Sequence, residues 1–217
     1  IRLKVGMEKR VAQDNEFAWD LFRQVLDNTK EANTFISPLS VSIALGMTWN
    51  GADGKTRSEM ESTLKMSGIS EKEINEYYQI MQNSLVKIDP STKLNIANSI
   101  WYKDGFPIYQ SFLDVNKEYF NAEVSALDFS DPKSLDKIND WCSKKTNGLI
   151  KNPLDRIPAD AIMYLINAIY FKGIWSSEFN SKDTSEKDFV TSGGKTNKVD
   201  MMRQEQTFNY FEDGKAQ

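Results

Sequence analysis

The sequence predicts an α+β fold in which helices precede a large mixed β-sheet, and three observations lead to that class. Apolar residues recur at helical spacing between residues 17 and 85. From Leu94 to Tyr102 the pattern changes to strict alternation, which is typical of a strand. The most apolar stretch, residues 161–174, is rich in β-branched and aromatic residues. It is therefore expected to form a central strand that is buried on both faces.

Apolar periodicity and a start signal indicate the first two helices. Residues 17–26 place apolar side chains on one face, which predicts an amphipathic helix. Ser37 followed by Pro38 is a strong start signal, because serine caps helix N-termini and proline is favoured at the first helical position. Residues 39–47 are apolar nearly all round, so the helix they predict is expected to be buried centrally.

Capping boxes predict the start of the next two helices. Thr56 with Glu59 fits the box, and so does Ser70 with Glu73. The second box is expected to begin a helix with one apolar stripe, formed by Ile74, Tyr77, Tyr78, Met81 and Leu85.

The alternating segment predicts which side chains share a face of its strand. One face is expected to carry Leu94, Ile96, Asn98, Ile100 and Tyr102, and the other Asn95, Ala97, Ser99 and Trp101. Residues 109–120 then predict a helix and residues 124–129 a short strand. A further helix is expected to start at Asp131-Pro132 and to stop near Gly148.

The last part of the chain returns to strand-like segments over residues 182–210, with Gly193-Gly194 as a turn. Phe208 and Tyr210 alternate with polar residues before Asp213-Gly214, which predicts a hairpin. The second strand of that hairpin would follow Gln217. The chain is therefore expected to be a fragment that stops at a loop tip.

Composition excludes several classes of function. The 217 residues carry a net charge of −4 with no strongly basic segment, which argues against nucleic acid as a partner. No apolar run is long enough to span a bilayer. The single cysteine, Cys142, cannot form an internal disulfide. The compartment is left open by these residues.

Enzyme chemistry is restricted by the absence of histidine. Without it the chain cannot build a Ser-His-Asp or Cys-His nucleophile system or an HExxH zinc site. Carboxylates and lysines are plentiful, but no spacing singles out a catalytic pair. We therefore assign no catalytic, cofactor-binding or metal-ligating residue, and expect a protein that is not an enzyme.

Several segments, in order, resemble the serpin family of serine and cysteine protease inhibitors. Residues 33–60 read NTFISPLSVSIALGMTWNGADGKTRSEM, which is similar to the pattern around the second serpin helix. Further similar stretches are LNIANSIWYKDGFPIYQSF, INDWCSKKTNGLIKN, LINAIYFKGIWSSEF and VDMM. The resemblance implies a serpin fold, with a smaller second sheet beside the large one. It also implies that residues 1–217 form the N-terminal part of a single serpin domain, whose reactive-centre loop and reactive bond are not in this chain.

The resemblance carries roles for four residues. Ser37, Ser40 and Asn167 match the shutter, the polar cluster beneath the point where the main serpin sheet opens. Trp175 matches the breach, where loop insertion begins. Three plainer interpretations stay open: Ser37 as a simple N-cap, Asn167 as a strand residue facing solvent, and Trp175 as an ordinary core aromatic.

The function that the resemblance implies is inhibition of a serine or cysteine endopeptidase by a suicide-substrate mechanism. The alternative is a non-inhibitory serpin that acts as a carrier, chaperone or storage protein. The expected partners are the target protease and the C-terminal remainder of the same serpin, with no nucleic acid, no membrane span and no cofactor. The resemblance favours an extracellular, cell-surface or periplasmic location.

Five lysines around the predicted sixth helix could form a glycosaminoglycan patch: Lys133, Lys137, Lys144, Lys145 and Lys151. Acidic residues interleave among them, so a solvated helix face is the favoured interpretation.

Overall fold

The computed structural model describes residues 7–30, 33–207 and 209–214. Contacts between Cα atoms group the chain into two compact units, Ile1–Lys172 and Gly173–Gln217. The first unit contains six helices and three strands among its described residues. The second contains a short 3₁₀ helix and two strands.

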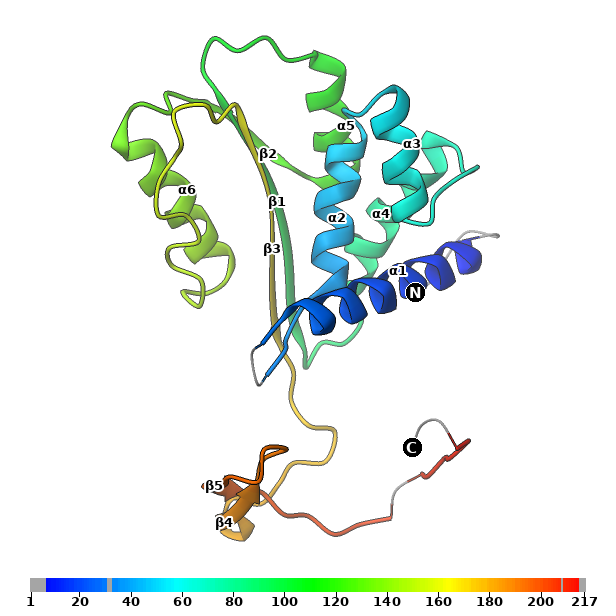
Figure 1. Cartoon of the computed structure of the whole chain (residues 1–217), viewed down its shortest axis with the longest axis vertical. Helices are drawn as coiled ribbons and strands as arrows, with labels where there is room; N and C mark the ends of the chain where they lie inside the picture. Colours follow the sequence, from blue (N-terminus) through cyan, green and yellow to red (C-terminus); the bar gives the residue numbers. More distant parts are fainter. Residues whose placement is uncertain (1–6, 31–32, 208, 215–217) are drawn as a thin grey trace. The chain divides into compact units, whose positions relative to one another are not determined.

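A three-stranded mixed sheet forms the centre of the first unit (Figure 1). β1 (Lys93–Lys103) lies in the middle, β2 (Glu123–Leu127) runs parallel to it, and β3 (Met163–Lys172) runs antiparallel to it. The prediction of a mixed sheet, with parallel and antiparallel strand pairs, is thus confirmed. The bounds of β1 match the predicted alternating segment closely.

The expectation for residues 161–174 is wrong in two respects. β3 is shorter than the apolar stretch, and it lies at an edge of the described sheet rather than at its centre. Ala168 is its only buried residue, and the others are half-buried or exposed. The reason is that an edge strand has a hydrogen-bonded neighbour on one side only, so its side chains lack flanking partners on the other.

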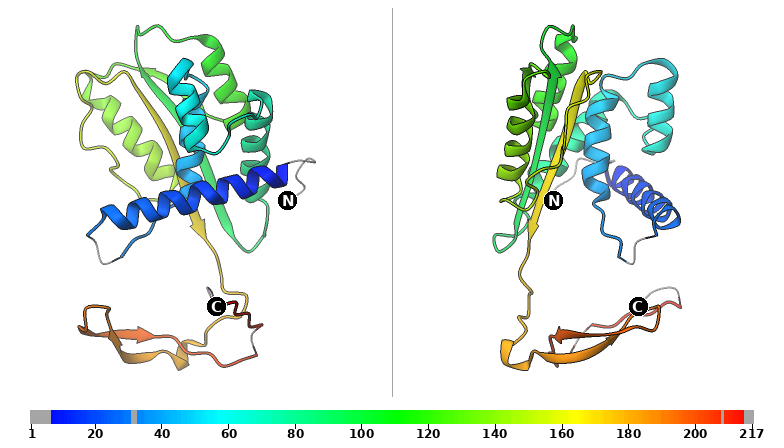
Figure 2. Two further views of the ribbon diagram at one scale, coloured as in Figure 1. Left: turned by 45° about the vertical axis from the view of Figure 1, so that its right-hand side comes forward. Right: turned by 60° about the vertical axis from the view of Figure 1, so that its left-hand side comes forward.

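Helices cover both faces of this sheet (Figure 2). One helix, α6 (Pro132–Lys145), packs on one face, and the others gather on the opposite side. These are α1 (Met7–Asn28), α2 (Pro38–Trp49), α3 (Gly54–Thr63), α4 (Glu71–Leu85) and α5 (Gln110–Phe120).

The two faces of β1 separate two hydrophobic cores. Ile96 and Ile100 pack into the core beneath the larger group of helices. Ala97 and Trp101 pack into the second core beneath α6, where the rings of Trp101 and Trp141 meet edge to face at 6.2 Å. The predicted assignment of alternate β1 residues to opposite faces is confirmed.

The two capping predictions have different outcomes. Ser70 and Glu73 form the predicted capping box at the start of α4, with the Ser70 amide 3.1 Å from the Glu73 carboxylate. The box at Thr56–Glu59 is wrong, because α3 already begins at Gly54 behind Asp53. Asp53 occupies the N-cap position with an extended backbone and without a side-chain capping hydrogen bond, so Thr56 falls inside the first turn.

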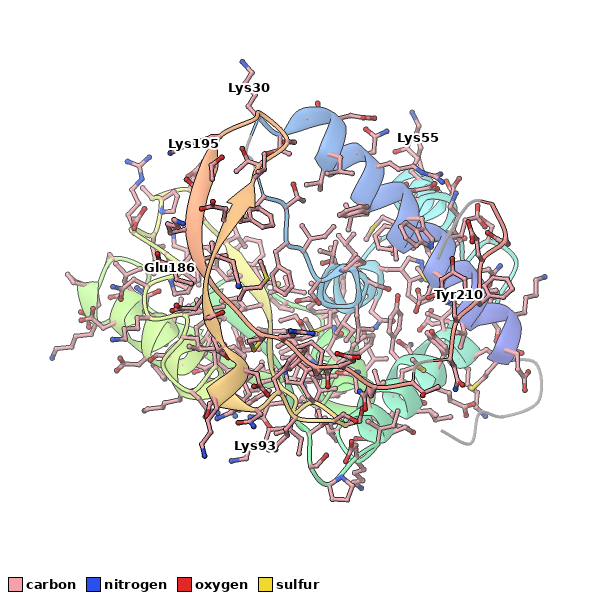
Figure 3. The ribbon with its side chains drawn as sticks, turned by 90° about the horizontal axis from the view of Figure 1, so that it is seen from below. Lys30, Lys55, Lys93, Glu186, Lys195 and Tyr210 are labelled. Carbon is pink, nitrogen blue, oxygen red and sulfur yellow. The ribbon has the colours of Figure 1, made fainter. Side chains whose placement is uncertain are left out.

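The second unit contains an antiparallel hairpin of β4 (Ser185–Val190) and β5 (Thr196–Met201), preceded by the 3₁₀ helix η1 (Ser181–Asp183). Gly193-Gly194 lies in its turn as predicted, with Gly194 at φ 78° and Lys195 directly after the turn, where its carbonyl accepts from the Thr191 amide at 2.9 Å (Figure 3). The smaller second sheet is thereby confirmed. Residues 209–214 contain no strand, so Tyr210 does not form the strand expected before Asp213-Gly214. Phe208, on which that expectation also rested, lies outside the described residues.

Candidate functional site

The middle of the β1–β3 pairing holds a pair of asparagines. Asn98 of β1 and Asn167 of β3 are directly opposite each other in the antiparallel register. The Asn167 side-chain amide donates to Oδ1 of Asn98 at 2.7 Å. The Ser40 hydroxyl, on the first turn of α2, donates to Oδ1 of Asn167. Ser40 and Asn167, two predicted site residues that are far apart in the sequence, are therefore in direct contact.

Asn167 does not face solvent. Its partner Asn98 is on the core-facing side of β1, and residues opposite each other in an antiparallel pair project from the same face of a sheet. The open alternative of a solvent-facing strand position is thus contradicted by the contact with α2.

Ser37 behaves as the N-cap of α2. Its backbone is extended, with φ −117° and ψ 92°, and its hydroxyl accepts from the Ser40 backbone amide at 3.4 Å. It is exposed, and its described bonds do not reach Asn167. Within the described part of the chain, Ser37 is linked to the asparagines only through Ser40.

Sequence reasoning missed two members of this site. Asn98 is only 2% exposed and donates to Oε1 of Gln82 at 2.7 Å and to the Phe120 carbonyl at 2.6 Å. Gln82 lies on α4 and is 4% exposed. The available signal was that Asn98 is the single polar residue in the apolar phase of the β1 alternation. We refer to Ser40, Gln82, Asn98 and Asn167 together as the seam cluster.

The seam cluster holds elements together and contains no acid or base. All four side chains are uncharged hydroxyl or amide groups, which donate and accept hydrogen bonds without titrating near neutral pH. The buried amides are satisfied by one another and by backbone carbonyls, as burial of polar groups requires. The cluster ties α2, α4, β1 and β3 to one another at a single point.

The described residues also bear on two further kinds of site, a metal site and a reactive cysteine. Among them no group of three or more His, Cys, Asp or Glu could hold a metal ion. Burial raises the pKa of the Cys142 thiol, which disfavours the thiolate that a nucleophile needs. No helix within the described ranges has the length and apolar character needed to cross a membrane.

Trp175 belongs to the second unit and is not part of the seam cluster as described. Its side chain is 61% exposed, and its ring meets that of Phe179 edge to face at 5.3 Å. The interpretation of Trp175 as an ordinary core aromatic stays open. Its assignment to the breach stays a prediction.

Two lysines of α6, Lys137 and Lys145, have local partners. Lys145 forms an ion pair with Glu123 at 2.6 Å, and its ammonium group lies 5.7 Å from the centre of the Trp141 ring. Lys137 lies over Trp101 in the same way. These pairings suit a solvated helix face of mixed charge.

Comparison with known proteins adds the family. The model of the family described as "Serpin (serine protease inhibitor)" matches residues 12–217. Corticosteroid-binding globulin of Oryctolagus cuniculus is 33% identical over 201 residues, covering 91% of this chain and 52% of that protein. Leukocyte elastase inhibitor of Xenopus laevis is 33% identical over 214 residues, covering 95% of this chain and 56% of that protein.

Solved structures agree with the sequence comparison. Cleaved kallistatin complexed with heparin superposes with a TM-score of 0.86 at 27% identity, covering 93% of this chain and 60% of that one. The chain belongs to the serpin family, whose members are generally inhibitors or binding proteins rather than catalytic enzymes. It spans about half the length of the curated relatives it matches.

Proposed function

We propose that the complete protein inhibits a serine or cysteine endopeptidase as a suicide substrate. The observation that carries the proposal is the contact of Ser40 with Asn167 in the seam cluster, because these are two of the residues that the family resemblance assigns to the point where the main sheet opens. In the described residues β3 pairs only with β1, and the inserted strand of the complete protein is proposed to pair along the other side of β3. A loop freed by cleavage is a suitable strand, since strand addition needs only an unpaired sheet edge.

The proposed reaction uses the nucleophile of the protease. Its serine or cysteine attacks a loop peptide bond, the new amine end leaves, and an ester or thioester joins the loop to the protease. Water would normally hydrolyse that bond. Insertion of the loop beside β3 carries the protease away and distorts its active site before hydrolysis occurs. The driving force is the gain of ladder hydrogen bonds and burial.

This chain contributes the sheet that accepts the strand. We assign Ser37, Ser40 and Asn167 to the shutter, where they resist opening of the sheet, and Trp175 to the breach. Residues 1–217 are then the N-terminal part of one serpin domain, and the C-terminal remainder with its reactive-centre loop is a required partner. The similarity to leukocyte elastase inhibitor supports an inhibitory role.

The second candidate is a carrier without inhibitory activity. The similarity to corticosteroid-binding globulin, at the same 33% identity, favours it. Both candidates use the same scaffold, and they differ in whether a cleaved loop inserts.

Incubation of the complete protein with serine and cysteine proteases tests the proposal. We expect an SDS-stable adduct for at least one protease, with the summed mass of the two proteins less the segment released after the cleaved bond. The matched control is the same protease with its nucleophile chemically blocked, which should form no adduct. Cleavage of the loop without any adduct across the panel would contradict inhibition and leave the carrier as the better explanation.

A further inference from the structure

Gln82 is an unusual residue for its position. It lies on the buried face of α4, which also carries Ile74, Tyr77 and Tyr78, and it is only 4% exposed. A helix face that packs into a hydrophobic core does not need an amide, and an unsatisfied buried amide is unfavourable. The position is therefore informative about what Gln82 contacts.

Both ends of the Gln82 amide are used. Oε1 accepts from Nδ2 of Asn98 at 2.7 Å, and Nε2 donates to the Tyr78 carbonyl one turn earlier at 3.1 Å. The bond to Tyr78 fixes which way the amide points, because a flipped amide would place two oxygens against each other. Gln82 is thus locked with its oxygen toward β1.

That orientation determines the direction of the next two amides. Nδ2 of Asn98 faces two acceptors, the Gln82 oxygen and the Phe120 carbonyl, so its oxygen must point toward β3. Asn98 Oδ1 then accepts from Asn167, whose own oxygen is left to accept from Ser40. The donors run one way, from Ser40 through Asn167 and Asn98 to Gln82 and the Tyr78 carbonyl.

We propose that Gln82 is a positioning residue for the β1–β3 seam, acting through Asn98 on Asn167. By orienting Asn98, it keeps Asn167 bonded across the two strands and so opposes separation of β3 from β1. The inference rests on the proposed function for its consequence, which is that β3 stays paired with β1 while the inserted strand adds to its other side. The structural part of the proposal, that Gln82 slows hydrogen exchange of β3 by keeping it paired with β1, does not depend on any protease.

Hydrogen–deuterium exchange of the complete protein tests the proposal with Gln82→Met. Methionine has a similar length and fills the same space without polar atoms, so the core stays packed. We expect exchange of residues 163–172 to become about fivefold faster, the ratio that corresponds to loss of one net hydrogen bond. The matched control is Gln79→Met, because Gln79 lies on the same helix and donates to the Glu118 carbonyl outside the seam cluster. It should leave exchange of these residues unchanged.

A double-mutant cycle separates positioning from a merely structural role. Asn167→Ala should accelerate exchange in the parent but add little in the Gln82→Met background, because the chain of donors is already broken. Additive effects, or unchanged exchange in Gln82→Met, would overturn the proposal. If Gln82→Met does not fold, Gln82→Leu serves, since it also removes both polar atoms of the amide. The ratio of exchange in residues 163–172 to that in residues 123–127 should then rise above that of the parent, and an unchanged ratio would overturn the proposal.

Because exchange is measured without protease, failure here and failure of inhibition are distinguishable. If the protein forms no adduct but shows the expected exchange pattern, the proposed role of Gln82 is supported and the proposed inhibitory function is contradicted. If an adduct forms but exchange in Gln82→Met is unchanged, the proposed role of Gln82 is contradicted and the proposed inhibitory function is supported.

Discussion

At the scale of single residues, stability in this chain depends on polar side chains that are buried with partners. A second buried network, among the helices α1, α2 and α4, illustrates this. Asp14 accepts from Arg10 at 2.6 Å, from Ser42 at 3.1 Å and from Tyr77 at 2.6 Å, which ties α1 to α2 and α4. Arg10 also donates to the Leu64 carbonyl at 3.0 Å, at the end of α3. Removing one partner from such a network is costly, because it leaves the other buried and unpaired.

The two tyrosines of α4 predict loss of stability at high pH. Burial raises the pKa of Tyr78 to about 12, and burial together with the Asp14 charge raises the pKa of Tyr77. A tyrosine in the unfolded chain releases its proton near pH 10, as about 10 is its ordinary pKa. The folded state therefore holds protons that the unfolded state loses, and the free energy of unfolding should fall from about pH 10 to about pH 12.

Urea unfolding of the complete protein across that pH range measures the slope. Tyr78→Phe should make the slope shallower, since one of the two titrating groups is gone, while Tyr109→Phe, at a position that is 86% exposed, should not. A slope that is the same in Tyr78→Phe as in the parent would contradict the link between burial and titration.

At the scale of elements, α2 is a central helix of the first unit, in contact both with other helices and with the sheet. Its start is determined locally by Ser37 and Pro38, and its apolar surface lets it contact helices on one side and β3 on the other. Gly46 allows a close approach at one point. A Cβ atom there would lie 2.7 Å from Cε2 of Tyr78 and 3.3 Å from Cε1 of Phe120.

Gly46→Ala is therefore expected to destabilise the protein, although alanine is the better helix former. The gain in helix propensity is roughly 0.5–1 kcal/mol, whereas overpacking a rigid ring costs about 1–3 kcal/mol. We expect a net loss of about 1 kcal/mol or more in the free energy of unfolding, measured by urea denaturation. Gly193→Ala is the control, because a Cβ there would meet nothing closer than 4.0 Å. Equal or higher stability of Gly46→Ala would show that Tyr78 moves aside freely.

At the scale of the whole molecule, the proposed function requires a metastable native state. Cutting the reactive loop of the complete protein should then stabilise it, the reverse of what nicking does to most proteins. Each new ladder hydrogen bond contributes roughly 0.5–1.5 kcal/mol, and buried apolar side chains add about 25 cal/mol per Å². Across one strand the sum reaches several kcal/mol, enough to raise Tm by about 10 °C or more.

Melting curves of intact and loop-cleaved protein, followed by tryptophan fluorescence, check this expectation. If Trp175 is at the breach, part of the emission change on cleavage should disappear in Trp175→Phe, while Trp19→Phe serves as the control. An unchanged Tm would favour the carrier, and a lower Tm would count against strand insertion altogether.

What the sequence determined by itself is the set of elements that depend on neighbouring residues. The helix starts at Ser37 and Ser70, the opposite faces of β1 and the turn at Gly193-Gly194 follow from local backbone preferences and from periodicity. The family also followed from the sequence, because several specific segments occur in order along the chain. The capping box predicted at Thr56 is wrong, because the helix begins two residues earlier, at Gly54 behind Asp53.

Only the tertiary structure decided which distant residues meet. The place of β3 in the described sheet depends on pairing with β1, from which residues 104–162 separate it, and apolarity alone does not encode that pairing. In the same way, the sequence does not show that Gln82 and Asn98 are partners. Their amides meet at 2.7 Å only because α4 packs on β1. A hydrogen bond acts over a few ångströms of space rather than of sequence, so the seam cluster exists only once the fold has formed.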